Sequence, residues 1–103
     1  MSRSAENPGE PSVGGTPVVL PVALLITDSR SFAEGLRQAA ALGDVRVDAS
    51  GLRDIDTAGL QLLLATRLAA LAAGHEFRWL AESPGLRTAA SAIGLTQALG
   101  LAA

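Results

Sequence analysis

The stretch from Asp54 to Gly74, D-I-D-T-A-G-L-Q-L-L-L-A-T-R-L-A-A-L-A-A-G, constrains the fold more than any other part of the chain. Asp56 and Thr57 are residue types that cap helices, because a short polar side chain can accept from a free N–H of the first turn. Gly59, early in the helix, lets another segment approach its backbone closely, and Gly59→Ala is expected to be neutral or slightly stabilising in the isolated domain. Gly74 is typical of the position just after a helix. The stretch therefore predicts a turn from a strand into one long helix.

This helix is apolar on nearly every side. Gln61, Thr66 and Arg67 are the only polar side chains between its first and last alanines. A helix of that kind is either buried on two sides or offers one face to a partner. Its core face is expected to consist of five leucines: Leu60, Leu63, Leu64, Leu68 and Leu71.

The opposite face carries Ala58, Leu62, Ala65 and Ala69. Alanine is the best helix former, so the alanines by themselves indicate no contact. Leu62 is different, because helical rotation points it away from the core leucines. We expect Leu62 to be an apolar anchor for a partner; the alternative is that the end of the chain, around Leu95 and Leu99, covers it.

Composition limits the classes of protein. The chain has 103 residues, enough for one small domain, and is 49% hydrophobic but only 3% aromatic, so its core must be aliphatic. It contains no cysteine, which excludes disulfides, thiolate catalysis and cysteine-bound metal. Eight arginines and ten acidic residues are interspersed for a net charge of −2, which argues against a nucleic-acid partner.

The chain shows no sign of a membrane or secretory segment. Arg67 interrupts the longest apolar run, and the first residues lack the apolar stretch of a signal peptide. We expect a cytoplasmic protein without membrane insertion. Residues 1–16, rich in Ser, Gly, Pro and Glu, are expected to form a disordered tail, and residues 17–103 one domain.

Three segments are expected to be strands. The first, Val18–Ile26, is interrupted by Pro21, which cannot donate to a ladder, so this strand should lie at an edge or bend there. The second, V-R-V-D-A-S from Val45, alternates cleanly between apolar and polar residues. In the third, F-R-W-L-A, Leu80 breaks a similar alternation. Alternation indicates a sheet with helices on one side and water on the other.

Helices are expected between and after the strands. Asp28 and Ser29 can cap one that runs from Arg30 to Leu42, and Ser83 can cap another that ends at Gly94. A short terminal helix, ended by Gly100, should follow. The order β-α-β-α-β-α-α, with helical crossovers between the strands, predicts that neighbouring strands are parallel and that the domain is a two-layer α/β sandwich.

No enzyme motif is present. The phosphate-binding, dinucleotide-binding and nucleophile-elbow patterns are all missing. A lone histidine, His75, is poor evidence for a metal or a general base, and Asp54 with Asp56 fits a capped polar loop better than a carboxylate pair. We therefore expect no enzymatic activity, no cofactor and no metal. A hydroxyl at a helix start, beside an acid and an apolar face, is typical of a site that is regulated by covalent modification rather than of a catalytic residue.

These residues resemble the STAS domain of anti-sigma-factor antagonists. The resemblance rests on V-R-V-D-A-S-G-L-R-D-I-D-T-A-G-L-Q-L-L-L, Gly74, F-R-W-L-A, S-P-G-L-R and I-G-L, and covers Val18 to about Leu99. Its specific element is D-[ST]-[STA]-G-L. The resemblance implies a mixed β-sheet of about four strands with helices mainly on one face.

In that family the hydroxyl residue after the aspartate accepts phosphate from a partner kinase, which implies that role for Thr57. Ala58 replaces the second hydroxyl that many members carry, and the segment Ala23–Asp28 lacks the family's Gly-Glu-Leu-Asp turn. In these features the chain is most similar to stand-alone STAS proteins of chemosensory or two-component systems. It is also similar to the STAS subunit of the Mla phospholipid-transport ABC complex, whose Thr-bearing helix start binds the ATPase.

The sequence thus predicts a non-enzymatic regulatory module that binds a protein, such as an anti-sigma factor with serine-kinase activity, and is switched at Thr57. A constitutive, ATPase-binding subunit is the alternative. A third class, STAS domains that bind a small molecule, would need a closed apolar pocket, which no sequence feature indicates. The expected partner-binding residues are Asp56, Thr57, Ala58, Gly59, Gln61, Leu62, Ala65 and Ala69.

Overall fold

The computed structural model describes residues 17–102 and, of the side chains in helix α1, those of Arg30 and of residues 32–42. The tail expected over residues 1–16 lies outside this part. Helices separate the strands as predicted, but two short strands precede α1 and two precede α2, where one was expected in each place. The strands are β2 (Val18–Val19), β3 (Ala23–Leu24), β4 (Val45–Asp48), β5 (Asp54–Ile55) and β6 (Phe77–Ala81). The helices are α1 (Ile26–Leu42), α2 (Thr57–Ala72) and α3 (Pro84–Ala92).

The described strands form two small parallel sheets. One has the order β2-β4-β6, with Val18 beside Val47 and Val47 beside Trp79. The other pairs β3 with β5. The α/β class, the one-sided helices and the parallel neighbours expected from the helical crossovers agree with the prediction. The mixed sheet of about four strands implied by the family resemblance differs, because every described pair is parallel. The reason is that α1 and α2 each carry the chain back to the same end of the sheet before the next strand starts.

Pro21 divides the first strand, as predicted. Before it, the Leu20 N–H donates to the Asp48 carbonyl at 2.9 Å. After it, the Val22 carbonyl accepts from the Arg53 N–H at 2.7 Å, so the chain beyond Pro21 pairs with the segment that leads into β5 rather than with β4. β2 lies at the edge of its sheet, where a neighbouring proline costs no ladder bond.

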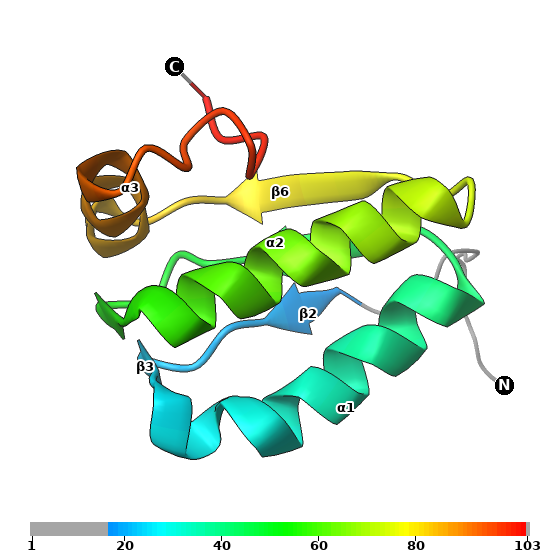
Figure 1. Cartoon of the computed structure of the whole chain (residues 1–103), viewed down its shortest axis with the longest axis horizontal. Coiled ribbons are helices and arrows are strands. Elements are labelled where there is room, and N and C mark those ends of the chain that lie inside the picture. Colours follow the sequence, from blue (N-terminus) through cyan, green and yellow to red (C-terminus); the bar gives the residue numbers. More distant parts are fainter. Residues whose placement is uncertain (1–16, 103) are drawn as a thin grey trace, which may run out of the picture.

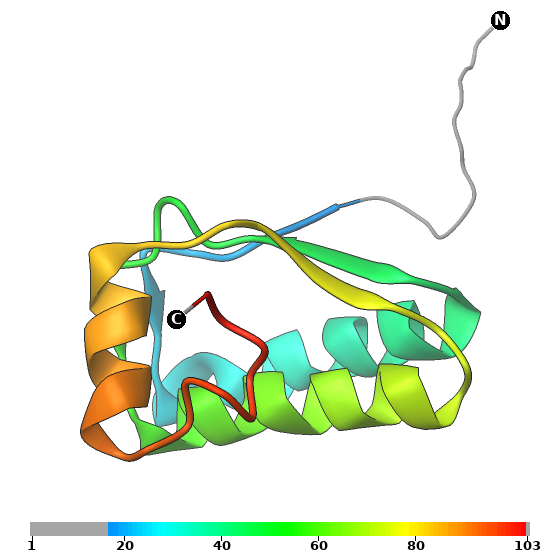
Figure 2. The ribbon, with the colours of Figure 1, turned by 90° about the horizontal axis from the view of Figure 1, so that it is seen from above.

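The alternation along β4 separates two faces of the sheet. Val45 and Val47 are fully buried, while Arg46 and Asp48 are half-exposed on the other face. Figure 2 shows α1 and α2 together on one side of the strands, with α3 closing one end. Leu80 of β6 is 49% exposed, whereas Trp79 and Ala81 on either side of it are half-buried. Exposed and half-buried positions therefore alternate through Leu80.

The core is aliphatic, as the composition predicted. Its largest fully buried side chains come from both sheets, all three helices and the two loops that follow β4 and α3. They are Leu24, Leu36, Val45, Val47, Leu52, Leu60, Leu63, Leu86 and Leu99.

Two of the helix predictions are wrong. α1 begins at Ile26, before Asp28 and Ser29, and its N-cap residue Leu25 contributes no side-chain cap. The chain enters this helix as soon as β3 ends at Leu24, so a buried strand end, rather than a capping side chain, sets the start. The terminal helix expected before Gly100 is instead a series of turns.

The start of α3 agrees with the prediction. The Ser83 hydroxyl oxygen accepts from the Leu86 N–H at 3.1 Å, and Pro84 occupies the first helical position. Gly94 follows this helix with a φ of +73°, a conformation that glycine adopts without strain. No helix within residues 17–102 is long and apolar enough to cross a membrane.

Candidate functional site

Asp56 stands at the junction where β5 turns directly into α2. Its backbone is extended (φ −99°, ψ −179°), and its carboxylate accepts from the Gly59 N–H at 2.9 Å. Asp56 is therefore the N-cap, which satisfies one free donor of the first turn. Both Asp56 and Thr57 were possible caps from sequence; the structure assigns the role to Asp56 and leaves the Thr57 hydroxyl without it.

Thr57 is the first residue of α2, and its side chain is exposed. Its hydroxyl makes no hydrogen bond with any group that the structure describes. The first turn of a helix carries free N–H groups and the positive end of the helix dipole, which favour a negative charge there. An added phosphate would therefore meet an accessible hydroxyl in a favourable field.

Three serines that the structure describes, Ser50, Ser83 and Ser91, differ from Thr57 as possible phosphate acceptors. The Ser50 hydroxyl donates to the Asp48 carboxylate at 2.7 Å, and Ser83 is buried as the cap of α3. Ser91 is exposed, but it lies in the last turn of α3, where the helix dipole disfavours negative charge. Among these hydroxyls, Thr57 alone is exposed at a helix start.

Gly59 lies against the end of the neighbouring strand. A β-carbon built at this position would overlap the carbonyl oxygen of Leu24 and lie 2.8 Å from Cγ1 of Ile55. The close approach expected from the sequence is thus present within the domain itself. It brings α2 onto the β3–β5 pair and fixes where Thr57 stands.

The expected partner face of α2 is only partly free. Gln61, Ala65 and Ala69 are exposed, and Ala58 is half-exposed. Leu62 is half-buried and packs against the hydrophobic core. It lines a small hollow of about 70 Å³ between the two parallel helices of Figure 1, together with Ala33, Arg37, Ala65, Thr66 and Ala69.

Leu62 therefore points toward α1, and not toward the end of the chain. Thr66, one turn further along, donates its hydroxyl to the Leu62 carbonyl at 2.8 Å and is buried. The α1 side of α2 is thus a packed flank. Leu62 can contribute only its remaining exposed surface to a partner.

Two leucines expected in the core are exposed instead. Leu68 is 54% exposed and Leu71 46%, whereas Leu63 is fully buried. At about 100° per residue, Leu68 lies about 140° around the helix from Leu63, which puts it on the outer face. Once the structure places Leu63 in the core, this rotation assigns Leu68 to the outer face. The outer face of α2 therefore carries more apolar surface than the sequence analysis assigned to it.

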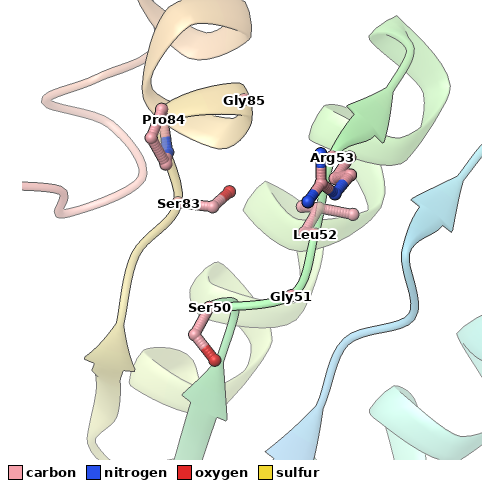
Figure 3. A pocket seen from close by; sticks show the side chains of 7 residues that line it. All are labelled: Ser50, Gly51, Leu52, Arg53, Ser83, Pro84 and Gly85. Atoms are coloured by element: carbon pink, nitrogen blue, oxygen red, sulfur yellow. The ribbon is translucent and has the colours of Figure 1, made fainter.

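A hollow of about 400 Å³ lies between the β4–β5 loop and the start of α3, a region the sequence analysis did not mark. In Figure 3, Ser83 extends from the α3 side toward Leu52, and Arg53 stands on the loop opposite Gly85. Hydrogen bonds from the Ser50 hydroxyl and N–H hold the pKa of nearby Asp48 below its usual value. The hollow is open to solvent and has both polar and apolar walls.

Within residues 17–102, no group of three or more histidine or acidic side chains is placed to hold a metal ion. The arrangement is that of a binding surface: a capped helix start, an exposed hydroxyl and an apolar outer face.

A one-sided α/β sandwich with an Asp-capped, hydroxyl-bearing start of its second helix defines a STAS domain protein. The chain matches the family described as "Mlab, STAS domain" over residues 16–101 and belongs to that family. No curated protein and no solved structure matches it significantly. Domains of this family are generally non-enzymatic modules for protein–protein interaction.

Proposed function

We propose that this STAS domain is a regulatory protein-binding module whose partner docks at the start and along the outer face of α2. The observation that carries the proposal is the exposed Thr57 hydroxyl, which stands beside the Asp56 cap and has no hydrogen-bond partner among the described groups. The docking surface consists of Asp56, Thr57, Ala58, Gln61, Ala65, Ala69 and the exposed part of Leu62, extended by the exposed Leu68. Gly59 is buried against Leu24 and positions the start of the helix beneath this surface.

Phosphorylation of Thr57 by a partner serine kinase switches this surface. Phosphate adds about −1.5 to −2 charges at neutral pH, next to the carboxylate of Asp56. A nearly neutral, apolar helix face becomes strongly anionic at one end. A partner surface that is complementary to the unmodified face therefore binds the phosphorylated face more weakly. The first-turn N–H groups stabilise the phosphate once it is attached.

A constitutive role is the second candidate, and the family assignment favours it. In an Mla-type phospholipid-transport ABC complex, the same surface would bind the ATPase without modification. Thr57 would then be a contact residue, buried against the partner. Phosphate on Thr57 would block assembly rather than regulate it.

One pair of experiments separates these roles. The purified chain is incubated with ATP and a purified anti-sigma-factor serine kinase from the same organism, and its intact mass and peptides are mapped. In parallel, its binding to the purified Mla-type ATPase is titrated. The switch predicts one phosphate, on Thr57, that is absent from Thr57→Ala and unaffected in Ser91→Ala.

The constitutive role predicts no phosphate and a stable complex with the ATPase. In that case Thr57→Glu should weaken the complex at least tenfold, whereas Ser91→Glu should leave it unchanged. Phosphate on another residue would overturn the switch at Thr57. A chain that binds neither protein would overturn the proposed function as a whole.

A further inference from the structure

Residues 95–102, which we name the strap, lie between α2 and β6 without forming a helix or a strand. Figure 2 shows this segment, in red, leaving α3 and returning toward the sheet. Leu99 is fully buried and Leu101 is 7% exposed, so two leucines of the strap belong to the core. Gly94 (φ +73°) precedes the strap and Gly100 (φ +75°) lies within it.

After Leu95, the backbone hydrogen bonds of the strap join residues within the strap itself. Among the described residues, one backbone bond ties it to a neighbouring element, from the Leu95 N–H to the Ala90 carbonyl at 2.8 Å. The internal bonds run from Leu99 to Leu95 at 2.9 Å, from Gly100 to Gln97 at 3.0 Å and from Leu101 to Thr96 at 3.0 Å.

Side chains from three elements hold the strap by its carbonyl groups. The donors are Arg67 of α2 to Ala98 at 2.9 Å, Trp79 of β6 to Leu99 at 2.8 Å and Arg87 of α3 to Ala102 at 2.9 Å. The strap is thus bound by surrounding side chains in the way that a protein binds a separate peptide.

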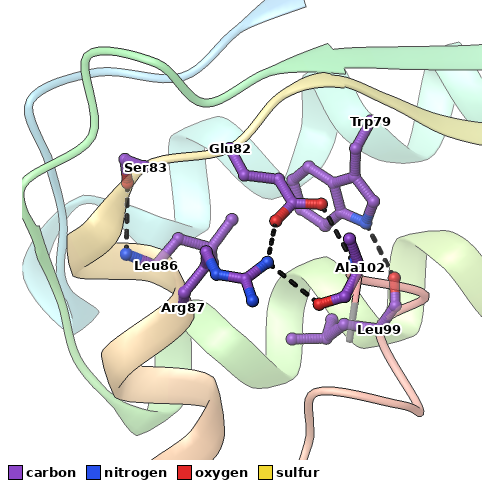
Figure 4. A network of polar contacts seen from close by, with 7 residues as sticks. All are labelled: Trp79, Glu82, Ser83, Leu86, Arg87, Leu99 and Ala102. Atoms are coloured by element: carbon purple, nitrogen blue, oxygen red, sulfur yellow. Dashed lines mark hydrogen bonds and ion pairs between the residues drawn. The ribbon is translucent and has the colours of Figure 1, made fainter.

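Glu82 completes the attachment, as Figure 4 shows. Its carboxylate accepts from the Ala102 N–H at 3.1 Å and forms an ion pair with Arg87 at 2.6 Å. The same guanidinium nitrogen of Arg87 also donates to the Ala102 carbonyl. The backbone N–H and the carbonyl of one strap residue, Ala102, are therefore both held by a single charged pair.

We infer that the strap opens as a unit about Gly94, and that its docking controls the outer face of α2 through Arg67. This regulation rests on the proposed function of α2. Arg67 is half-buried, and the Ala98 carbonyl is its hydrogen-bond acceptor among the described residues. A β-carbon at Gly100 would lie 2.9 Å from Nε of Arg67, so the strap packs directly on this guanidinium.

Opening of the strap removes both the acceptor and the cover of Arg67. The guanidinium is positively charged in both states, and the docked strap holds it against the Ala98 carbonyl. Opening frees it to extend over the flank of α2 next to the exposed Leu68 and Leu71. That flank adjoins the face proposed to meet an apolar partner surface, so an open strap brings the charge onto that face.

Hydrogen exchange on the full chain tests whether the strap opens independently. The amides of Leu99 and Leu101 are compared with those of Val45 and Ala49, which bond to the Glu76 and Ala81 carbonyls at 2.8 and 2.9 Å. The strap amides should exchange at least tenfold faster than the sheet amides, because they open without global unfolding.

Arg87→Ala should accelerate strap exchange by about a further tenfold, because it removes charge-assisted hydrogen bonds, and should leave the sheet amides unchanged. Arg78→Ala, which removes an exposed pair with Glu76, is the matched control and should change neither set. Equal exchange of Leu101 and Val45 in both wild type and Arg87→Ala would overturn the independent strap.

The regulatory part is tested by binding. The probe is whichever purified protein, kinase or ATPase, binds the wild-type chain in the experiments above. The double variant Arg87→Ala with Leu101→Ala, with its strap open by exchange, should bind at least threefold more weakly, and Arg78→Ala should bind normally. Unchanged affinity with an open strap would overturn the regulation alone. If the wild type binds neither probe, the proposed function and the regulation both fail, while the exchange data still decide whether the strap opens.

Discussion

Gly59 of α2 lies directly against the backbone carbonyl of Leu24, so that even a methyl group at this position would overlap the oxygen. The contact joins the start of the candidate binding helix to β3. It also reverses an expectation from sequence. Glycine costs roughly 1 kcal/mol relative to alanine inside a helix, so Gly59→Ala would be neutral or stabilising if nothing stood nearby.

We predict that Gly59→Ala destabilises the domain by about 1–3 kcal/mol, because a backbone oxygen cannot move aside as a flexible side chain can. Gly59→Val should cost more. Gly35→Ala is the matched control: it lies within α1 with nothing within 4 Å of its β-carbon position, and it should stabilise by roughly 0.5–1 kcal/mol. Urea denaturation of the three variants measures these differences. A Gly59→Ala variant as stable as Gly35→Ala would contradict the close approach.

Asp56→Ala should cost about 1 kcal/mol of folding free energy, the usual effect of losing an N-cap. Asp56→Asn keeps an acceptor for the Gly59 N–H and should recover most of that loss. Thr57→Ala should change stability by less than about 0.5 kcal/mol, because the side chain is exposed and the cap is elsewhere. Thermal denaturation gives all three values. A large loss in Thr57→Ala would show that its hydroxyl has a structural role.

Alanine substitutions of three leucines should distinguish residues that stabilise the fold from residues that bind a partner. They are Leu62, Leu63 and Leu68. Leu63→Ala removes a fully buried side chain and should cost about 2–5 kcal/mol. Leu62→Ala should cost less, roughly 1–2 kcal/mol, because the side chain is only half-buried against α1. Leu68→Ala should leave stability nearly unchanged and weaken partner binding.

Chemical denaturation of each variant, beside a binding titration, checks this order. Normal binding by Leu68→Ala would exclude the outer face of α2 from the interface. A Leu62→Ala variant that keeps full stability but loses binding would restore Leu62 as a freely exposed anchor.

Acid should weaken the attachment of the strap at Glu82. Partial burial opposes the charged form, but the hydrogen bond from the Ala102 N–H and the Arg87 guanidinium outweigh it, so the pKa of Glu82 lies below its ordinary value of 4.5. A carboxyl whose pKa is lower in the folded state stabilises the fold at pH above 4.5, and this stabilisation disappears as pH falls through the folded pKa.

Glu82→Gln should therefore be less stable than wild type at neutral pH and should approach it in acid. Glu76→Gln, in an exposed pair, should show no such convergence. Denaturation midpoints measured across the acid range test the prediction. Parallel pH curves for wild type and Glu82→Gln would contradict it.

Sequence alone determined the features that depend on neighbouring residues. The break at Pro21 follows from a missing N–H, the two faces of β4 from alternation, and the start of α2 from Asp56 followed by Gly59. The same local pattern marked Thr57 as the accessible hydroxyl candidate. Each depends on backbone chemistry or on a repeat of two to four residues, which the order of residues contains in full.

Tertiary structure decided what depends on distant segments. The division of the described strands into two separate sheets depends on how distant segments pair. The exposure of Leu68 and Leu71, and the burial of Leu62 against α1, depend on how the helices rotate to pack.

The strap shows the same limit most clearly. Residues 95–102 have a pattern that is compatible with a helix, but Arg67, Trp79 and Arg87 bind their carbonyl groups instead. Those donors lie 31, 20 and 15 residues away along the chain. Local propensity cannot reveal such partners, because they become neighbours only when the fold brings them together.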